Sequence, residues 1–154
     1  MFVSHWPELR EAEKAFDARQ FASAEGALSR ILAKDDSVFE ARLYRALARL
    51  YLGKLQEAKE DTSFCCKIRP NDSVAWMLQG EVELEVQEFE ASYQSFSEAI
   101  RLEKDNGRAL FGMAKAAVAL GKTREASDLL EEALQFDRDF VLAQCFSRLL
   151  RMPS

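Results

Sequence analysis

The chain has 154 residues, of which 48% are hydrophobic and 31% charged, as expected for one globular domain with its own core. Its 21 Lys and Arg against 26 Asp and Glu give a net charge of -5, which argues against a nucleic-acid phosphate backbone as the main partner. No apolar stretch approaches the ~18 residues of a membrane span, and residues 1–10 lack the basic start and apolar run of a signal peptide. We therefore expect no membrane insertion. The three cysteines show no disulfide or zinc spacing, so we expect the protein to be cytoplasmic.

Three columns of residues keep a spacing of 34 along the chain. Counted with His5 as repeat position 1, they occupy positions 8, 20 and 27 of four consecutive units. The columns are Ala12, Ala46, Gly80 and Ala114; Ala24, Ala58, Ser92 and Ala126; and Ile31, Cys65, Ala99 and Ala133. A period of this length is typical of stacked helix–turn–helix units. It predicts an all-α chain, one domain over residues 1–154, with repeats at 5–38, 39–72, 73–106 and 107–140.

Each repeat is expected to contain a helix A, a short turn, a helix B and a short loop. The turns fall at one place in every repeat: Arg19–Gln20, Gly53–Lys54, Gln87–Glu88 and Gly121–Lys122. Glycine at such a turn supplies the left-handed residue that ends helix A. In the loops between repeats, Ser37, Asp72 and Asn106 are suited to cap the next helix, and the last loop is expected at 137–139.

Residues 141–151 predict one further helix. Leu142, Cys145, Phe146, Leu149 and Leu150 fall on one side of it, and polar residues fall on the other. A terminal unit with a polar outer face is what a stack of repeats needs for solubility. We therefore expect a C-terminal capping helix here.

The sequence offers few residues for catalysis or metal binding. His5 is its single histidine, and no serine or cysteine has a base at suggestive spacing. Cys65 and Cys66 occupy positions 27 and 28, which are core positions in every repeat, and a buried free cysteine behaves as a small hydrophobe. We expect no enzymatic activity, no cofactor and no metal.

Three arginines form a stripe on the otherwise apolar helix A of the second repeat: Arg42, Arg45 and Arg49. A partly buried arginine left alone would cost several kcal/mol. We therefore expect acids of neighbouring elements to pair with all three. Glu83, which shares position 11 with Arg49 in the next repeat, is a candidate partner for Arg49.

The repeats resemble those of the tetratricopeptide repeat family. That family has small residues at positions 8, 20 and 27, a large residue at 4, aromatic or large apolar residues at 17 and 24, and often proline at 32. The third repeat matches through Trp76, Gly80, Phe89, Phe96 and Ala99; the fourth through Leu110, Ala114, Gly121, Ala126, Leu130 and Ala133; and the second through Ala46, Ala58 and Pro70. The resemblance implies a right-handed superhelix of antiparallel helix pairs. Its concave groove would hold a peptide or a partner's helix.

In this family, positions 2, 5, 9, 12 and 13 of each helix A face the groove. Here the resemblance places there Trp6, Leu9, Glu13, Phe16 and Asp17; Glu40, Leu43, Leu47, Leu50 and Tyr51; Val74, Met77, Glu81, Leu84 and Glu85; and Arg108, Phe111, Lys115, Val118 and Ala119. The centre of this surface is apolar, as in receptors for apolar helices or extended segments. The predicted partner-binding residues are Leu9, Phe16, Leu43, Leu47, Leu50, Tyr51, Met77, Leu84, Phe111 and Lys115. The alternative is that these side chains pack on one another or on the C-terminal helix.

Two functions of the family can be tested residue by residue. Receptors for the acidic tails of heat-shock chaperones use a clamp of lysine, asparagine and arginine, and the corresponding positions here are Leu9, Glu13, Tyr44, Val74 and Leu78, or Leu43, Leu47, Leu78, Arg108 and Gly112. Only Arg108 fits. The peroxisomal import receptor uses groove asparagines, whereas Asn71 and Asn106 fall in loops.

We therefore predict a protein–protein interaction module, an adaptor, scaffold or co-chaperone, that binds a peptide or amphipathic helix of a partner protein. The alternatives are a small secretion-type chaperone and an obligate subunit of a larger complex. The sequence is also compatible with a homo-oligomer.

Overall fold

The computed structural model describes residues 6–142 and 144, and all regular secondary structure in this part is helical. Its helices are α1 (Pro7–Asp17), α2 (Phe21–Lys34), α3 (Phe39–Leu52), α4 (Leu55–Ile68), α5 (Ser73–Glu85), α6 (Phe89–Leu102), α7 (Gly107–Ala119) and α8 (Thr123–Phe136). The second helix of each pair begins at residue 21, 55, 89 or 123, so the starts keep the spacing of 34. The predicted order of helix A, turn, helix B and loop is thereby confirmed.

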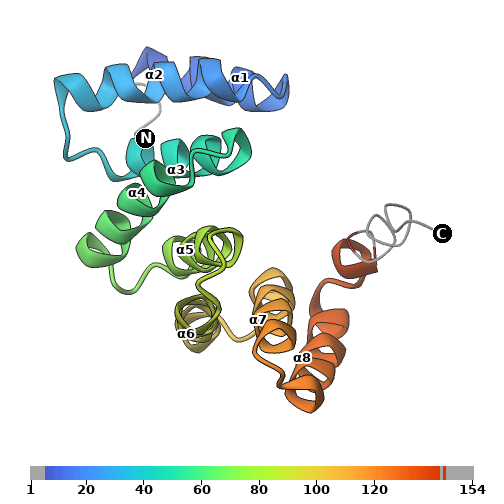
Figure 1. Cartoon of the computed structure of the whole chain (residues 1–154). Coiled ribbons are helices and arrows are strands. Elements are labelled where there is room, and N and C mark those ends of the chain that lie inside the picture. The colour runs from blue at the N-terminus through green and yellow to red at the C-terminus, as the bar shows by residue number, and fades with distance from the viewer. Residues whose placement is uncertain (1–5, 143, 145–154) are drawn as a thin grey trace. The chain divides into compact units, whose positions relative to one another are not determined.

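The contacts divide the chain into a first unit, residues 1–70, and a second unit, residues 71–154. Each unit holds two helix pairs, α1 to α4 in the first and α5 to α8 in the second (Figure 1). The boundary at Pro70 and Asn71 falls in the loop between the second and third repeats. A single domain over the whole chain stays a prediction.

The three columns of repeat positions 8, 20 and 27 are buried in all four repeats, because the paired helices cross there. Phe96 shows the physical reason in the second unit. A Cβ atom on Gly80 would come within 2.9 Å of the Phe96 ring, and one on Gly112 within 2.4 Å. Ser92 Oγ also donates a hydrogen bond of 2.7 Å to the carbonyl of Gly80. Glycine at position 8 of the third repeat and at position 6 of the fourth therefore lets the large Phe96 ring fill the space between helices.

In every repeat, the turn between the paired helices has one residue with a left-handed backbone, and this residue always falls at the same repeat position. Gly53 and Gly121 have φ of 76° and 78°, and Arg19 and Gln87 occupy the same repeat position with φ of 56° and 68°. Side chains with a Cβ rarely adopt this conformation. The turn is therefore imposed by the packing of the two helices, even where glycine is absent.

The loops between repeats agree with the sequence in part. Asp72 and Asn106 accept hydrogen bonds of 3.0 Å from the backbone nitrogens of Ala75 and Ala109, which confirms them as caps. The prediction for Ser37 is wrong, because Ser37 donates back to the carboxylate of Asp35 and Val38 precedes α3 without a side-chain cap.

The C-terminal segment begins its helical structure earlier than predicted. Residues 138–142 are helical, and so is residue 144, so the last loop shortens to Asp137. The Asp137 carboxylate accepts a hydrogen bond of 3.4 Å from the backbone nitrogen of Phe140. Most of the predicted helix at 141–151 lies outside the described residues, as does His5.

Across the described residues, the helices are too short or too polar to cross a bilayer.

The arginine stripe of α3 is part of a buried ion-pair network in the first unit. Asp61 on α4 is 1% exposed. Its carboxylate accepts hydrogen bonds of 2.9 and 2.8 Å from Arg45 and of 2.9 Å from Arg49, and it lies 3.7 Å from Arg42. Arg49 also donates to Glu25 on α2 at 2.8 Å. The network thus joins α2, α3 and α4, and all three arginines have acids as partners, as predicted.

The acids that pair with Arg49 in the first unit are Asp61 and Glu25, which the sequence pattern did not single out. Glu83 lies in the second unit, where it accepts a hydrogen bond from Ser95. A pair between Arg49 and Glu83 stays a prediction.

Candidate protein-interaction site

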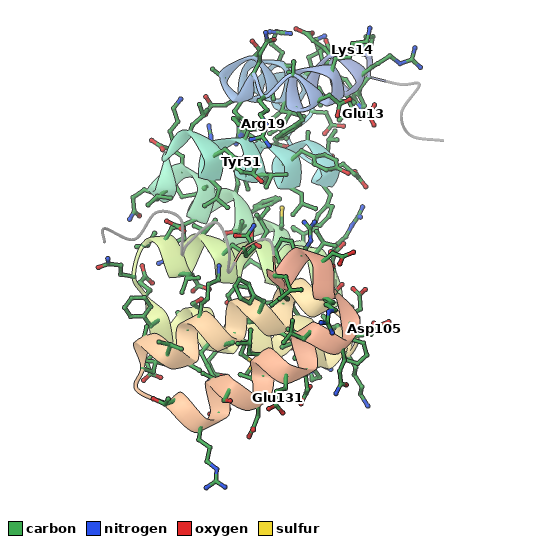
Figure 2. All side chains as sticks on the ribbon, turned by 90° about the vertical axis from the view of Figure 1, so that its right-hand side faces the viewer. Glu13, Lys14, Arg19, Tyr51, Asp105 and Glu131 are labelled. Carbon is green, nitrogen blue, oxygen red and sulfur yellow. The ribbon has the colours of Figure 1, made fainter. Side chains whose placement is uncertain are left out.

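A hollow of about 650 Å³ opens between α1, the turn after it, and α3 of the first unit. It is called the first hollow below. Its lining residues are Leu9, Ala12, Glu13, Phe16, Asp17, Arg19, Phe21, Glu40, Tyr44, Leu47 and Tyr51. Figure 2 shows Arg19 and Tyr51 close together on this unit, where the turn after α1 faces α3. The size lies within the ~300–1,000 Å³ of typical ligand sites.

Four aromatic rings form the walls of the first hollow. Phe16 lies 6.1 Å from Phe21 and 6.4 Å from Tyr44, and Phe21 stacks on Tyr51 at 4.5 Å with 13° between the ring planes. Tyr44 is 47% exposed and Tyr51 61% exposed. Large aromatic side chains gathered at a concave surface and left this open are typical of a protein-interaction site.

The rim of the first hollow is acidic. Three of its lining residues are carboxylates, Glu13, Asp17 and Glu40, and one, Arg19, is a cation. The Glu40 carboxylate forms an ion pair of 3.4 Å with the guanidinium of Arg69, which follows α4. Both side chains are exposed to solvent. The first hollow therefore combines an aromatic interior with net negative charge.

The second unit has a smaller hollow of about 320 Å³ at equivalent repeat positions. It is lined by Leu84, Glu85, Gln87, Phe89, Lys115 and Val118. Leu84 stands where the first hollow has Phe16, and Lys115 stands where it has Leu47. This second hollow has one aromatic ring, one carboxylate and one ammonium group, so its charges balance.

The structure distributes the ten predicted groove residues over several environments. Leu9, Phe16, Leu47 and Tyr51 line the first hollow, and Leu84 and Lys115 line the second. The remaining four are Leu43 and Phe111, which are buried, and Leu50 and Met77, which are half-buried and line neither hollow. Met77 packs against the core around Phe96.

Phe111 is covered by the C-terminal segment of the second unit. It packs in a core cluster with Leu110, Ala133 and Val141, and its ring meets that of Phe140 edge-on at 6.1 Å. Only 6% of Phe111 is exposed. The alternative considered from the sequence, in which groove side chains pack on the C-terminal segment, therefore applies to this residue.

Glu81 stands at a groove-facing position of α5 in the second unit. Burial raises the pKa of its carboxyl above the ordinary value, and Glu85 adds to the shift, whereas Lys115 and Arg108 oppose it. The charges of Glu81, Glu85, Lys115 and Arg108 therefore interact electrostatically on this face of the second unit.

The sequence prediction missed Phe21, Tyr44 and Arg19 as lining residues of the first hollow. Tyr44 occupies repeat position 6, next to the groove-facing set, where the second unit has Gly112. Position 6 therefore does not need a large side chain for the fold, and a tyrosine there could have been recognised as a candidate binding residue.

Within the described residues, no group of three or more His, Cys, Asp and Glu side chains is placed to hold a metal ion. Cys65 and Cys66 are buried in α4, in agreement with their predicted core positions.

Comparison with known proteins agrees with this architecture. A sequence profile of the family described as tetratricopeptide repeat matches residues 83–144. No curated protein sequence matches the chain. The family profile covers most of the second unit, and a solved tetratricopeptide protein superimposes on 85% of the chain, so the chain has the tetratricopeptide repeat fold.

Three solved structures illustrate the likeness. MamA 41-end from Desulfovibrio magneticus RS-1 has a TM-score of 0.79 at 14% identity, over 86% of this chain and 75% of that one. TTC0263, a thermophilic tetratricopeptide protein in Thermus thermophilus, has a TM-score of 0.78 at 18% identity, over 85% and 73%. The first such domain of Spaghetti (RPAP3), bound to the HSP90 peptide SRMEEVD, has a TM-score of 0.70 at 20% identity, over 73% and 89%. At these identities the likeness establishes the fold.

Proposed function

We propose that this protein is a protein–protein interaction module, acting as an adaptor or co-chaperone-like protein without enzymatic activity, that binds an apolar segment of a partner in the first hollow. One observation carries the proposal: Phe16, Phe21, Tyr44 and Tyr51 surround an open space of about 650 Å³, and the two tyrosines are 47% and 61% exposed. Exposed aromatic anchors in a concave site supply most of the binding energy in protein interfaces, at ~2 kcal/mol or more for each hot spot.

The partner of this site differs in charge from the ligand of the RPAP3 domain. That domain is bound to an HSP90 peptide with two glutamates and a C-terminal aspartate. In those members of the tetratricopeptide repeat family that bind acidic chaperone tails, cationic and amide side chains occupy the clamp positions. This chain has Leu9, Glu13 and Tyr44 at three of them, all in the first hollow. An acidic tail would meet a carboxylate here, so we exclude that ligand class from the proposal.

The cytoplasm is the compartment that we propose. The sequence supports it, because its three cysteines show no disulfide spacing and reduced cysteines are the norm there.

The test is selection of binding peptides from a displayed library of random sequences, followed by affinity measurement on the chain and its variants. The double variant Tyr44→Ser/Tyr51→Ser removes the two exposed rings with little expected effect on the core. Because two hot spots of ~2 kcal/mol each are lost, affinity should fall roughly 700-fold. These sites are preferable to Leu47 and Leu84, which are half-buried and also support the fold.

The matched control is Val118→Ser, since Val118 lines the second hollow and is 64% exposed. Circular dichroism and melting temperature should be unchanged in both variants. The proposal is wrong if the selected peptides bind the tyrosine variant with unchanged affinity. Loss of binding in Val118→Ser alone would move the site to the second hollow.

A further inference from the structure

We propose that the first hollow selects segments in which a lysine or arginine stands beside a large apolar side chain. This inference rests on the proposed function and specifies the chemistry of the partner. Its basis is the combination, in one small site, of exposed aromatic faces with two carboxylates, Glu13 and Asp17, that form no ion pair among the described residues.

The negative charge is local to the first hollow. The first unit as a whole has 12 Lys and Arg against 11 Asp and Glu, yet the first hollow has three carboxylates against one guanidinium. Many of the cations of the unit are engaged elsewhere. Arg42, Arg45 and Arg49 face Asp61; Arg30 pairs with Glu11, Lys34 with Glu8 and Lys54 with Glu25.

Glu13 and Asp17 lie four residues apart on α1, which places their side chains on the same face of the helix. In the described part of the chain, neither takes part in an ion pair. Two like charges at this spacing repel each other, and a cation bound between them relieves the repulsion. The pair is therefore suited to receive a positively charged group from a partner.

The aromatic faces of the first hollow favour the same group. A guanidinium or ammonium ion over an aromatic ring is attracted to its negative face, and arginine combines this contact with hydrogen bonds to carboxylates. The chain itself stacks Arg42 on Phe64 at 3.9 Å and Arg69 on Phe39 at 4.0 Å. No such contact involves the four rings of the first hollow in the described residues, so their exposed faces are available.

The second hollow shows what the same repeat positions look like when the chain supplies its own cation. Lys115 replaces Leu47, and its ammonium group lies 5.0 Å from the centre of the Phe111 ring. Gly112 stands where the first hollow has Tyr44. The preference for a basic partner is therefore specific to the first hollow.

The apolar part of the partner follows from the remaining lining of the first hollow. Leu9, Ala12 and Leu47 carry no charge and lie among the aromatic rings. They accept an aliphatic or aromatic side chain, while the carboxylates of Glu13 and Asp17 remain at the rim for the adjacent lysine or arginine. A partner with charge alone would leave this apolar surface unused.

The test uses the peptides selected from the random library, together with versions in which each Lys and Arg is changed to Gln. We expect the selected peptides to carry net positive charge next to a large apolar residue. The change to Gln should weaken binding about tenfold. This difference should shrink at high salt, because ions screen the rim charges.

Glu13→Gln/Asp17→Asn should remove most of the discrimination between the Lys- or Arg-containing peptides and their Gln versions. The matched control Glu85→Gln, at the repeat position of Asp17 in the second hollow, should leave it intact. Selected peptides that are neutral or acidic, yet still lose affinity in Tyr44→Ser/Tyr51→Ser, would overturn the charge preference and leave the proposed function standing. A library that yields no binding peptide would overturn both.

Discussion

In the first unit, repeat positions 11 and 23 hold Arg49 and Asp61, whose side chains approach to 2.9 Å. In the second unit, the same positions of the third repeat hold Glu83 and Ser95, and the serine hydroxyl donates a hydrogen bond to the carboxylate. Both pairs join the two helices of one repeat, and all four side chains except that of Arg49 are almost fully buried. Repeat positions 11 and 23 can therefore hold either a network of ion pairs or a single hydrogen bond between uncharged and charged side chains.

The two units also differ at repeat position 6. Phe96 fills the space beside Gly112 in the second unit, so that no side chain larger than hydrogen fits there. In the first unit the residue equivalent to Phe96 is Leu28, which is also fully buried but smaller. Position 6 is then free to carry Tyr44, which opens into the first hollow. A smaller core residue in one helix thus makes room for a binding residue on the next.

The largest effect is expected from Asp61→Ala. The substitution leaves the guanidinium groups of Arg42, Arg45 and Arg49 without their common buried partner. Removing one side of a buried ion pair costs ~3–5 kcal/mol of unfolding free energy. Urea denaturation of the full chain would measure this change.

The matched substitution in the second unit is Ser95→Ala, which takes one hydrogen-bond donor from Glu83. We expect a smaller loss of ~1–3 kcal/mol, since one buried acceptor loses one partner. Equal losses of unfolding free energy in Asp61→Ala and Ser95→Ala would show that the charged network stabilises the fold no more than the polar contact does.

Gly112→Ala is expected to have an intermediate effect. The new Cβ atom would lie 2.4 Å from the Phe96 ring, which is held between Gly80 and Gly112 and can move little. Overpacking of this kind costs ~1–3 kcal/mol. In the first unit, Tyr44→Ala at the same repeat position should cost less than ~1 kcal/mol, because Tyr44 is half exposed. Equal losses in the two denaturation curves would contradict the different roles of position 6.

The smallest effects concern pH, and they have opposite signs in the two units. Repeat position 21 holds Glu25 in the first unit and Tyr93 in the second. Burial acts to raise the pKa of Glu25, but hydrogen bonds from Lys54 and Arg49 outweigh it, so the pKa lies below its ordinary value. Burial and the hydrogen bond to Glu125 raise the pKa of Tyr93 to about 12.

The stabilisation from Glu25 is therefore present above the ordinary carboxyl pKa and is lost as pH falls through the lowered one. That from Tyr93 is present below pH ~10 and is lost as pH rises towards 12. The unfolding free energies of Glu25→Gln and Tyr93→Phe should each lie within ~1 kcal/mol of that of the parent chain at neutral pH. In denaturation curves recorded across pH, the first difference should vanish in acid and the second in alkali. The expected pH dependence is wrong if the difference for Glu25→Gln vanishes in alkali and that for Tyr93→Phe vanishes in acid.

Much of the fold was predictable from residue type and spacing. Ala24, Ala58, Ser92 and Ala126 marked the helix crossings because only small side chains let two helices approach closely. Gly53 and Gly121 marked the turns because their backbone is left-handed, and Asp72 and Asn106 marked helix starts because their side chains bond to nearby backbone nitrogens. These features depend on a few neighbouring residues, so the sequence by itself determined them.

The open surface was decided by the tertiary structure. Leu43 and Tyr44 are adjacent in α3, yet Leu43 is buried and Tyr44 is 47% exposed at the first hollow. Phe111 had the sequence pattern of a groove residue, but Phe140 and Val141 cover it. Whether a side chain binds a partner or joins the core depends on the volume of side chains from helices distant in sequence. Repeat position alone does not contain that information.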